Sequence, residues 1–172
     1  MTRETKKEIK IYTVDRDGDD KADVIYLEFV LNEMSVGRAS ATIDANGEVT
    51  RLSVYEDLDG DGQVDTSDEQ IMKNLAIAYA QLQWSADFDK NKKEIKIHTR
   101  DADANAQAES IETQFFLDDQ KIGGAVATMS PDGSVADVAI NADLNGDGRI
   151  DTSDEQIMKD IASAYAKVVW PY

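Results

Sequence analysis

The chain has 172 residues, of which 41% are hydrophobic, and its formal net charge is −17. This length and hydrophobic content argue against a disordered chain and allow one domain with a sizeable core, or two small domains. The absence of cysteine excludes disulfides and thiolate metal sites, and no basic cluster indicates a nucleic-acid partner.

Residues 1–10 are polar and lack the apolar core of a signal peptide. No apolar run approaches the roughly 18 residues of a membrane-spanning helix. We therefore expect no membrane span. If the protein is exported, we expect its signal to be missing from this chain.

Four β-strands are predicted first, over Glu8–Val14, Val24–Leu31, Arg38–Asp44 and Val49–Glu56. Apolar and polar residues alternate along these segments, most clearly between Ile25 and Leu31, which places one row of side chains toward a core. Asn46-Gly47 separates the third and fourth segments and is a strong hairpin-turn signal.

An acidic loop joins the first two predicted strands. Its candidate metal ligands are Asp15, Asp17, Asp19, Asp23 and the backbone carbonyl of Lys21. The spacing resembles the DxDxDGxxD calcium loops in the hairpins of integrin-like propeller repeats, and this resemblance implies a calcium site. Asp20 stands where that family has glycine. A solvated polar hairpin is the alternative.

The segment Asp57–Asp68 has the spacing of a 12-residue calcium-binding loop. Its candidate ligands are Asp57, Asp59, Asp61, the backbone carbonyl of Gln63, Asp65 and Asp68. Short side chains at the first positions let the backbone wrap closely around a hard cation, and Gly62 permits the sharp turn. Val64 fills the apolar eighth position, which forms a short β-bridge where two such loops pair. An acidic turn that binds nothing is the alternative.

A helix is predicted directly after this loop. Its apolar stripe consists of Ile71, Leu75, Ala78, Tyr79 and Leu82. Thr66 and Glu69 have the spacing of a capping box at its start.

The sequence repeats itself at an offset of 86 residues. Lys6–Trp84 and Lys92–Trp170, called here the first and second repeats, are identical at 38 of 79 aligned positions. The second repeat has a 12-residue loop with candidate ligands Asp143, Asn145, Asp147, the backbone carbonyl of Arg149, Asp151 and Asp154. Its hairpin loop has candidate ligands Asp101, Asp103, Asn105 and Glu109.

This duplication predicts a calcium-binding unit at 1–84, a connector at 85–91 and a second unit at 92–172. The predicted fold class is α+β. We expect a tandem duplication of a ββββα unit, in which an antiparallel sheet carries a helix packed on one face.

Each 12-residue loop ends in Asp, where an EF-hand loop ends in Glu, and strands replace the helix that enters an EF-hand. In both respects the loops resemble the loop–helix half-hands of dockerin domains, over about 20 residues in each repeat. The resemblance implies calcium ligation by the residues named above. It is carried no further, because dockerin half-hands lie close in sequence and these lie 86 residues apart.

Sixteen of the 35 acidic residues are candidate ligands, and the other 19 nearly balance the 18 Lys and Arg, so the acidity belongs to the loops. We expect a calcium-binding protein with two sites and up to four, acting as a calcium-stabilised, non-enzymatic structural or interaction module. A calcium sensor or buffer is an alternative function, and Mg²⁺ or a lanthanide is an alternative ion. Because extracellular calcium fills sites of modest affinity, an extracellular or periplasmic location is expected.

Overall fold

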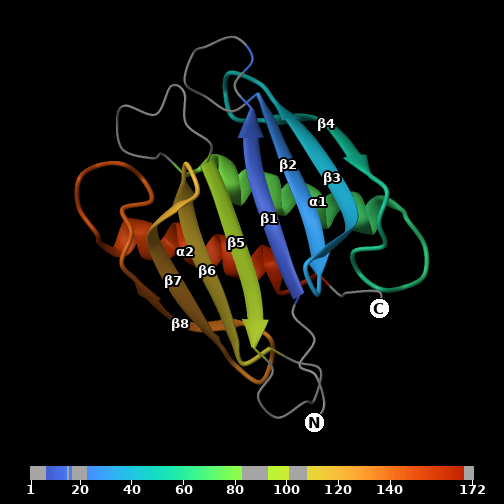
Figure 1. The fold of residues 1–172 in the computed structure, drawn as a ribbon. Helices are drawn as coiled ribbons and strands as arrows, with labels where there is room; N and C mark the ends of the chain where they lie inside the picture. The colour runs from blue at the N-terminus through green and yellow to red at the C-terminus, as the bar shows by residue number, and fades with distance from the viewer. Residues whose placement is uncertain (1–6, 15, 17–22, 83–92, 101–107, 169–172) are drawn as a thin grey trace.

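The structure is a computed structural model that describes residues 7–14, 16, 23–82, 93–100 and 108–168. In the first repeat its elements are β1 (Lys7–Val14), β2 (Val24–Leu31), β3 (Met34–Ile43), β4 (Val49–Val54) and α1 (Thr66–Ala80). In the second repeat they are β5 (Lys93–Arg100), β6 (Ser110–Leu117), β7 (Gln120–Met129), β8 (Val135–Ile140) and α2 (Thr152–Tyr165). Figure 1 shows their arrangement.

All eight strands form one antiparallel sheet, in the order β4-β3-β2-β1-β5-β6-β7-β8. Strands hold 46% of the described residues and helices hold 21%. The predicted fold class, an α+β tandem of two ββββα units, is therefore wrong. The described fold is β-rich, a single sheet with two helices.

The two repeats share a sheet because β1 pairs directly with β5. In this register Lys10 lies opposite Lys96, Glu8 opposite His98 and Tyr12 opposite Glu94. We call this strand pair the seam. A β1 left at the edge of its own sheet would expose a row of unpaired backbone N–H and C=O groups beside fully buried Ile9 and Ile11. Antiparallel pairing with β5, which carries the same KEIKI sequence, satisfies those groups and buries both strands.

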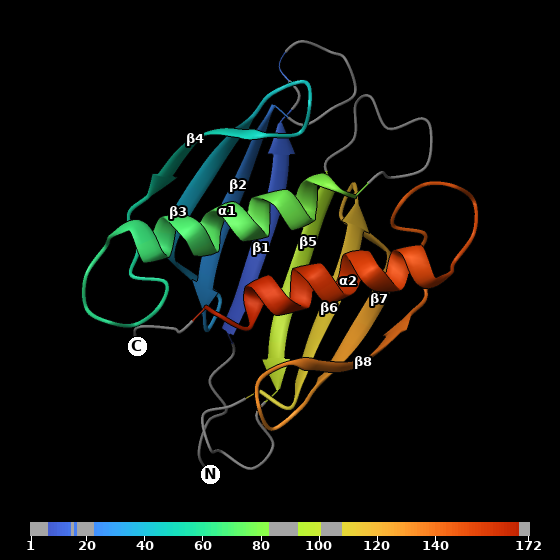
Figure 2. The same cartoon turned by 180° about the vertical axis from the view of Figure 1, so that it is seen from behind.

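Both helices pack side by side on one face of the sheet, and Figure 2 shows them running in opposite directions across the strands. The core between the helices and the sheet takes its side chains from both repeats. Leu58 and Leu144, from the two 12-residue loops, are 2% and 4% exposed and belong to this core. Each loop is therefore anchored at its second residue.

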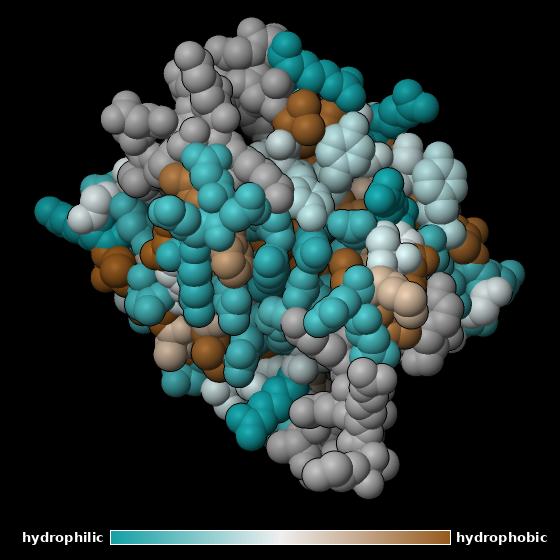
Figure 3. Space-filling view, in the orientation of Figure 1, coloured by the Kyte–Doolittle hydropathy of each residue, from teal (hydrophilic) through white to brown (hydrophobic). Residues whose placement is uncertain are grey.

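The other sheet face, called here the open face, carries the polar side chains of alternating strand positions, among them Glu8, Lys10, Tyr12, Lys96 and His98. It is largely hydrophilic in Figure 3. Within the described residues no helix lies on it, and no helix is long and apolar enough to cross a membrane.

Candidate metal centres

The loop 57–68 follows β4 and includes the first turn of α1, and its backbone is folded around its own aspartates. Asp57 accepts N–H bonds from Gly60 and Gly62, each at 2.7 Å, one on each carboxylate oxygen. Asp59 accepts from the Asp61 amide at 3.1 Å. Gly62 has φ +88°, and a Cβ placed there would meet no atom within 4 Å. The glycine is therefore required by backbone conformation and not by crowding.

Three carboxylates converge in this loop. Single oxygens of Asp57, Asp59 and Asp61 lie within 4.8 Å of one another, and these side chains range from half-buried to exposed. The Asp61 amide lowers the pKa of Asp59, but desolvation and the charges of Asp61, Asp68 and Asp57 outweigh it, so the net pKa of Asp59 is raised. The donor set is made of hard oxygens, which fits a hard cation such as Ca²⁺.

Asp68, at the twelfth position of the loop, is fully buried. Its Oδ1 accepts N–H bonds from Leu58 at 2.5 Å and Asp59 at 3.2 Å, and its Oδ2 accepts from Asp65 at 2.8 Å. A carboxylate oxygen has two lone pairs, so Oδ1 is saturated and only Oδ2 has one left. In this conformation Asp68 is a clamp that joins the two ends of the loop, with room for at most monodentate metal contact.

The same residues begin the helix. Asp65 is the N-cap of α1 and accepts from Ser67 N at 2.7 Å, while Asp68 completes a capping box. The predicted capping box of Thr66 and Glu69 is therefore shifted by one residue. Loop and helix cap overlap because a metal ligand and an N-cap both need a short side chain with an acceptor oxygen.

The loop 143–154 reproduces this network bond for bond. Asp143 accepts from Gly146 and Gly148 at 2.7 and 2.8 Å, and Asp154 accepts from Leu144, Asn145 and Asp151 at 2.6, 3.1 and 2.9 Å. Asp154 is fully buried, and Asp151 caps α2. The two loops therefore share one conformation, although Asn145 and Arg149 replace Asp59 and Gln63.

The two loops lie at opposite ends of the helix layer, as Figure 2 shows. Val64 and Ile150, at the eighth positions, are 51% and 54% exposed. These loops therefore do not pair with each other through a β-bridge, and each is a separate candidate centre.

Most of the candidate ligands in the two hairpin loops lie outside the described residues: Asp15, Asp17, Asp19, Lys21, Asp101, Asp103 and Asn105. Only Asp23 and Glu109 are described. Their backbones extend the sheet, since Asp23 N donates to Val14 O at 3.0 Å and Glu109 N donates to Arg100 O at 2.9 Å. Metal binding by these loops stays a prediction.

No family model matches the chain, and no curated protein matches it.

Proposed function

We propose that the protein binds one Ca²⁺ ion in each of the loops 57–68 and 143–154, as a calcium-stabilised, non-enzymatic structural or interaction module. The observation that carries this proposal is the convergence of the Asp57, Asp59 and Asp61 oxygens within 4.8 Å, in a loop whose backbone wraps around them. Three anionic groups held this close repel each other, and a cation between them relieves the repulsion.

The proposed ligands of the first ion are the side chains of Asp57, Asp59 and Asp61, with the carbonyl of Gln63. Asp65 contributes directly or through water, and Asp68 contributes through Oδ2. The proposed ligands of the second ion are Asp143, Asn145, Asp147, the carbonyl of Arg149, Asp151 and Asp154. A carboxylate at the twelfth position that binds through one oxygen supplies fewer ligand atoms than one that binds through both. This lowers the preference of the site for Ca²⁺ over Mg²⁺.

A stabilising role is supported by where the loops lie. Each loop connects an edge strand of the sheet to the start of a helix, so an ion there ties the two layers together. Binding energy that is available only in the folded state adds to the free energy of unfolding. The proposed setting, outside the cytoplasm, supplies calcium at the concentrations such sites need.

A calcium sensor is the less favoured alternative. Sensors expose a Met-rich groove when helices separate. Here Met72 and Met158 are fully buried between helix and sheet, in positions that repeat between the helices. Opening such a groove would break the core, so we place the sensor role second and a buffer role beside it.

The test is a calorimetric titration of chelator-treated protein with Ca²⁺, with far-UV circular dichroism and apolar-dye binding on the same samples. Asp61→Ala and Asp147→Ala form a matched pair, and each is expected to remove one site. Asp137→Asn, which removes one exposed charge on β8, is the control and should leave both sites intact.

Two sites in the unmodified protein, with reduced dye binding in calcium, support the stabiliser. Increased dye binding in calcium would favour the sensor. The absence of heat at about 1 mM Ca²⁺, the weak end of extracellular modules, would contradict calcium binding. A parallel titration with Tb³⁺ tests the lanthanide alternative. Tyr55 is 76% exposed and lies two residues before Asp57, where it can sensitise terbium in the first loop, whereas the second repeat has Asn141 there.

A further inference from the structure

The seam between β1 and β5 is the only strand pairing among the described residues that joins the two repeats. Four charged side chains occupy its open face, arranged as Glu8 and Lys10 on β1 and Glu94 and Lys96 on β5. Each lysine contacts the glutamate of its own strand, at 3.9 Å for Lys10 and 3.4 Å for Lys96. The two repeats are identical at these positions, since Glu8 aligns with Glu94 and Lys10 aligns with Lys96.

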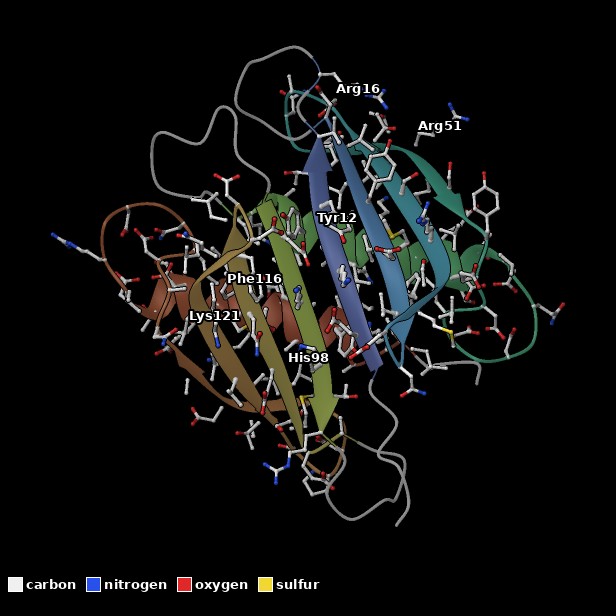
Figure 4. All side chains as sticks on the ribbon, in the orientation of Figure 1. Tyr12, Arg16, Arg51, His98, Phe116 and Lys121 are labelled. Carbon is white, nitrogen blue, oxygen red and sulfur yellow. The ribbon has the colours of Figure 1, made fainter. Side chains whose placement is uncertain are left out.

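The two ends of the seam differ. At one end Tyr12 lies opposite Glu94, and at the other end His98 lies opposite Glu8. Figure 4 shows Tyr12 and His98 at these two ends. His98 is the only histidine in the chain. A tyrosine stays neutral up to pH of about 10, whereas a histidine gains a positive charge within the range of pH 5–8.

His98 Nε2 lies 3.5 Å from Oε2 of Glu8, and the two side chains are 19% and 8% exposed. On its other side, His98 lies opposite Glu112 of β6. In the register of the sheet, His98 therefore lies between Glu8 of β1, which its imidazole contacts, and Glu112 of β6. Of the other charged groups that face it, Lys10 and Lys96 contact Glu8 and Glu94, and Arg100 is exposed two residues away on its own strand.

We propose that His98 is a pH-sensitive lock on the seam. When the imidazole is protonated, it forms an ion pair with Glu8 that ties β5 to β1, with Glu112 as a second anionic neighbour. When it is neutral, the contact loses its charge–charge attraction. The gain in stability is present where the imidazole is protonated, and it is lost as the pH rises and the imidazole becomes neutral.

This proposal is independent of the metal sites, because neither Glu8 nor His98 is a candidate ligand. Its regulatory consequence is that acidification strengthens the junction between the repeats while it weakens carboxylate metal sites.

The test is a double-mutant cycle with His98→Gln, Glu8→Gln and the double variant, measured by denaturant unfolding in chelator at pH 5.5 and pH 8. We expect a coupling of about threefold to tenfold in the unfolding equilibrium constant at pH 5.5, and a smaller coupling at pH 8. The other carboxylates titrate in the wild-type protein and in all three variants, so their contributions cancel in the coupling. Equal coupling at both pH values would overturn the proposal.

A second measurement does not depend on unfolding. The single imidazole is followed by NMR titration in the wild-type protein and in Glu8→Gln, and the midpoint is expected at lower pH in the variant. An unchanged midpoint would overturn the proposal. His98→Tyr serves as a folding-compatible variant, because the first repeat has tyrosine at this position. His98→Tyr should remove the part of the stability difference between pH 5.5 and pH 8 that depends on the imidazole.

Discussion

The two repeats differ mostly on the open face and are nearly the same on the face that packs against the helices. On the packed face, the pairs Ile9 and Ile95, Ile11 and Ile97, Ile25 and Ile111, Phe29 and Phe115, and Ala39 and Ala125 are identical, and all are buried. On the open face Tyr26, Arg38 and Arg51 are replaced by Glu112, Gly124 and Asp137. A core side chain is constrained by the volume around it, whereas a solvated one is not.

The two 12-residue loops, like the packed face, are nearly the same in the two repeats. The residues that shape the backbone are identical in both loops, including the two glycines and the buried clamp, and the difference is confined to Asn145, Arg149 and Ile150. Loop conformation is therefore maintained as strictly as the core. The two copies are internal controls for each other, and a change made in one repeat is best judged by the same change in the other.

The largest effect is expected from the clamp. Asp68→Ala leaves the buried N–H of Leu58 and the partly buried N–H groups of Asp59 and Asp65 without their acceptor, and it also removes half of the capping box. We expect a loss of about 3–4 kcal/mol of unfolding free energy in metal-free protein. Asp154→Ala should cost a similar amount, since its network is the same.

Urea denaturation in chelator measures this effect, with Asp61→Ala as the control that removes a candidate ligand but not the clamp. If Asp68→Ala is no worse than Asp61→Ala without metal, Asp68 acts as a ligand and not as a clamp. That result would restore the role predicted for the twelfth position from its spacing.

A smaller effect is expected at the turn glycines. Gly62→Ala and Gly148→Ala each place a Cβ on a backbone with φ of +88° and +84°, in open space. The left-handed conformation alone then costs about 1–2 kcal/mol, with no contribution from crowding. Thermal unfolding of both variants should show equal losses. Unequal losses would mean that the two loops differ in conformation despite their matching hydrogen bonds.

Thr113 is the one place where the packed faces of β2 and β6 differ in polarity, because the first repeat has Leu27 there. Thr113 is 1% exposed, and its Oγ1 has no hydrogen-bond partner. Thr113→Val keeps the shape and removes the unsatisfied hydroxyl, so we expect a gain of about 1 kcal/mol. The control is Thr128→Val on the open face, which should change little. A loss on Thr113→Val would indicate that its hydroxyl is satisfied in solution.

Much of the local structure follows from the sequence alone, because it depends on periodicity and turn chemistry. The alternation from Ile25 to Leu31, the glycine of Asn46-Gly47 and the stripe that starts at Ile71 all correspond to observed elements. The pairing of β1 with β5, which joins the two repeats in one sheet, could not be predicted in this way. Strand alternation indicates which face of a strand is buried, but not which strand lies at the edge of a sheet. The sequence signal for this pairing is the KEIKI segment that both repeats contain. Two copies of it can pair in antiparallel orientation with Lys10 opposite Lys96.

The candidate site, like the fold, could be predicted from the sequence only in part. The spacing of Asp57, Asp59 and Asp61 predicts carboxylates that approach each other, and they do. Spacing says nothing about competition for the oxygens of Asp68, which three backbone amides occupy. That competition depends on the burial of Leu58 against the core, which brings the start of the loop over the helix N-terminus.

The smallest expected effect is a pH dependence that only the first loop has. The net pKa of Asp59 is raised in the folded protein, because burial and the charges of Asp61, Asp68 and Asp57 outweigh the hydrogen bond from the Asp61 amide. A carboxyl group with a raised folded-state pKa is destabilising while it is charged, so metal-free protein gains stability as the pH falls through that pKa toward 3.8. Asp59→Asn should remove this gain, and Asn145 means that the second loop never has it. Unfolding of the wild-type protein and of Asp59→Asn in chelator between pH 7 and 4 measures the difference in stability. This difference should shrink in high salt, because Asp59 is only partly buried and salt screens the charges around it. Parallel pH profiles would show that the three carboxylates of the first loop do not repel each other in solution, and the case for a cation between them would weaken accordingly.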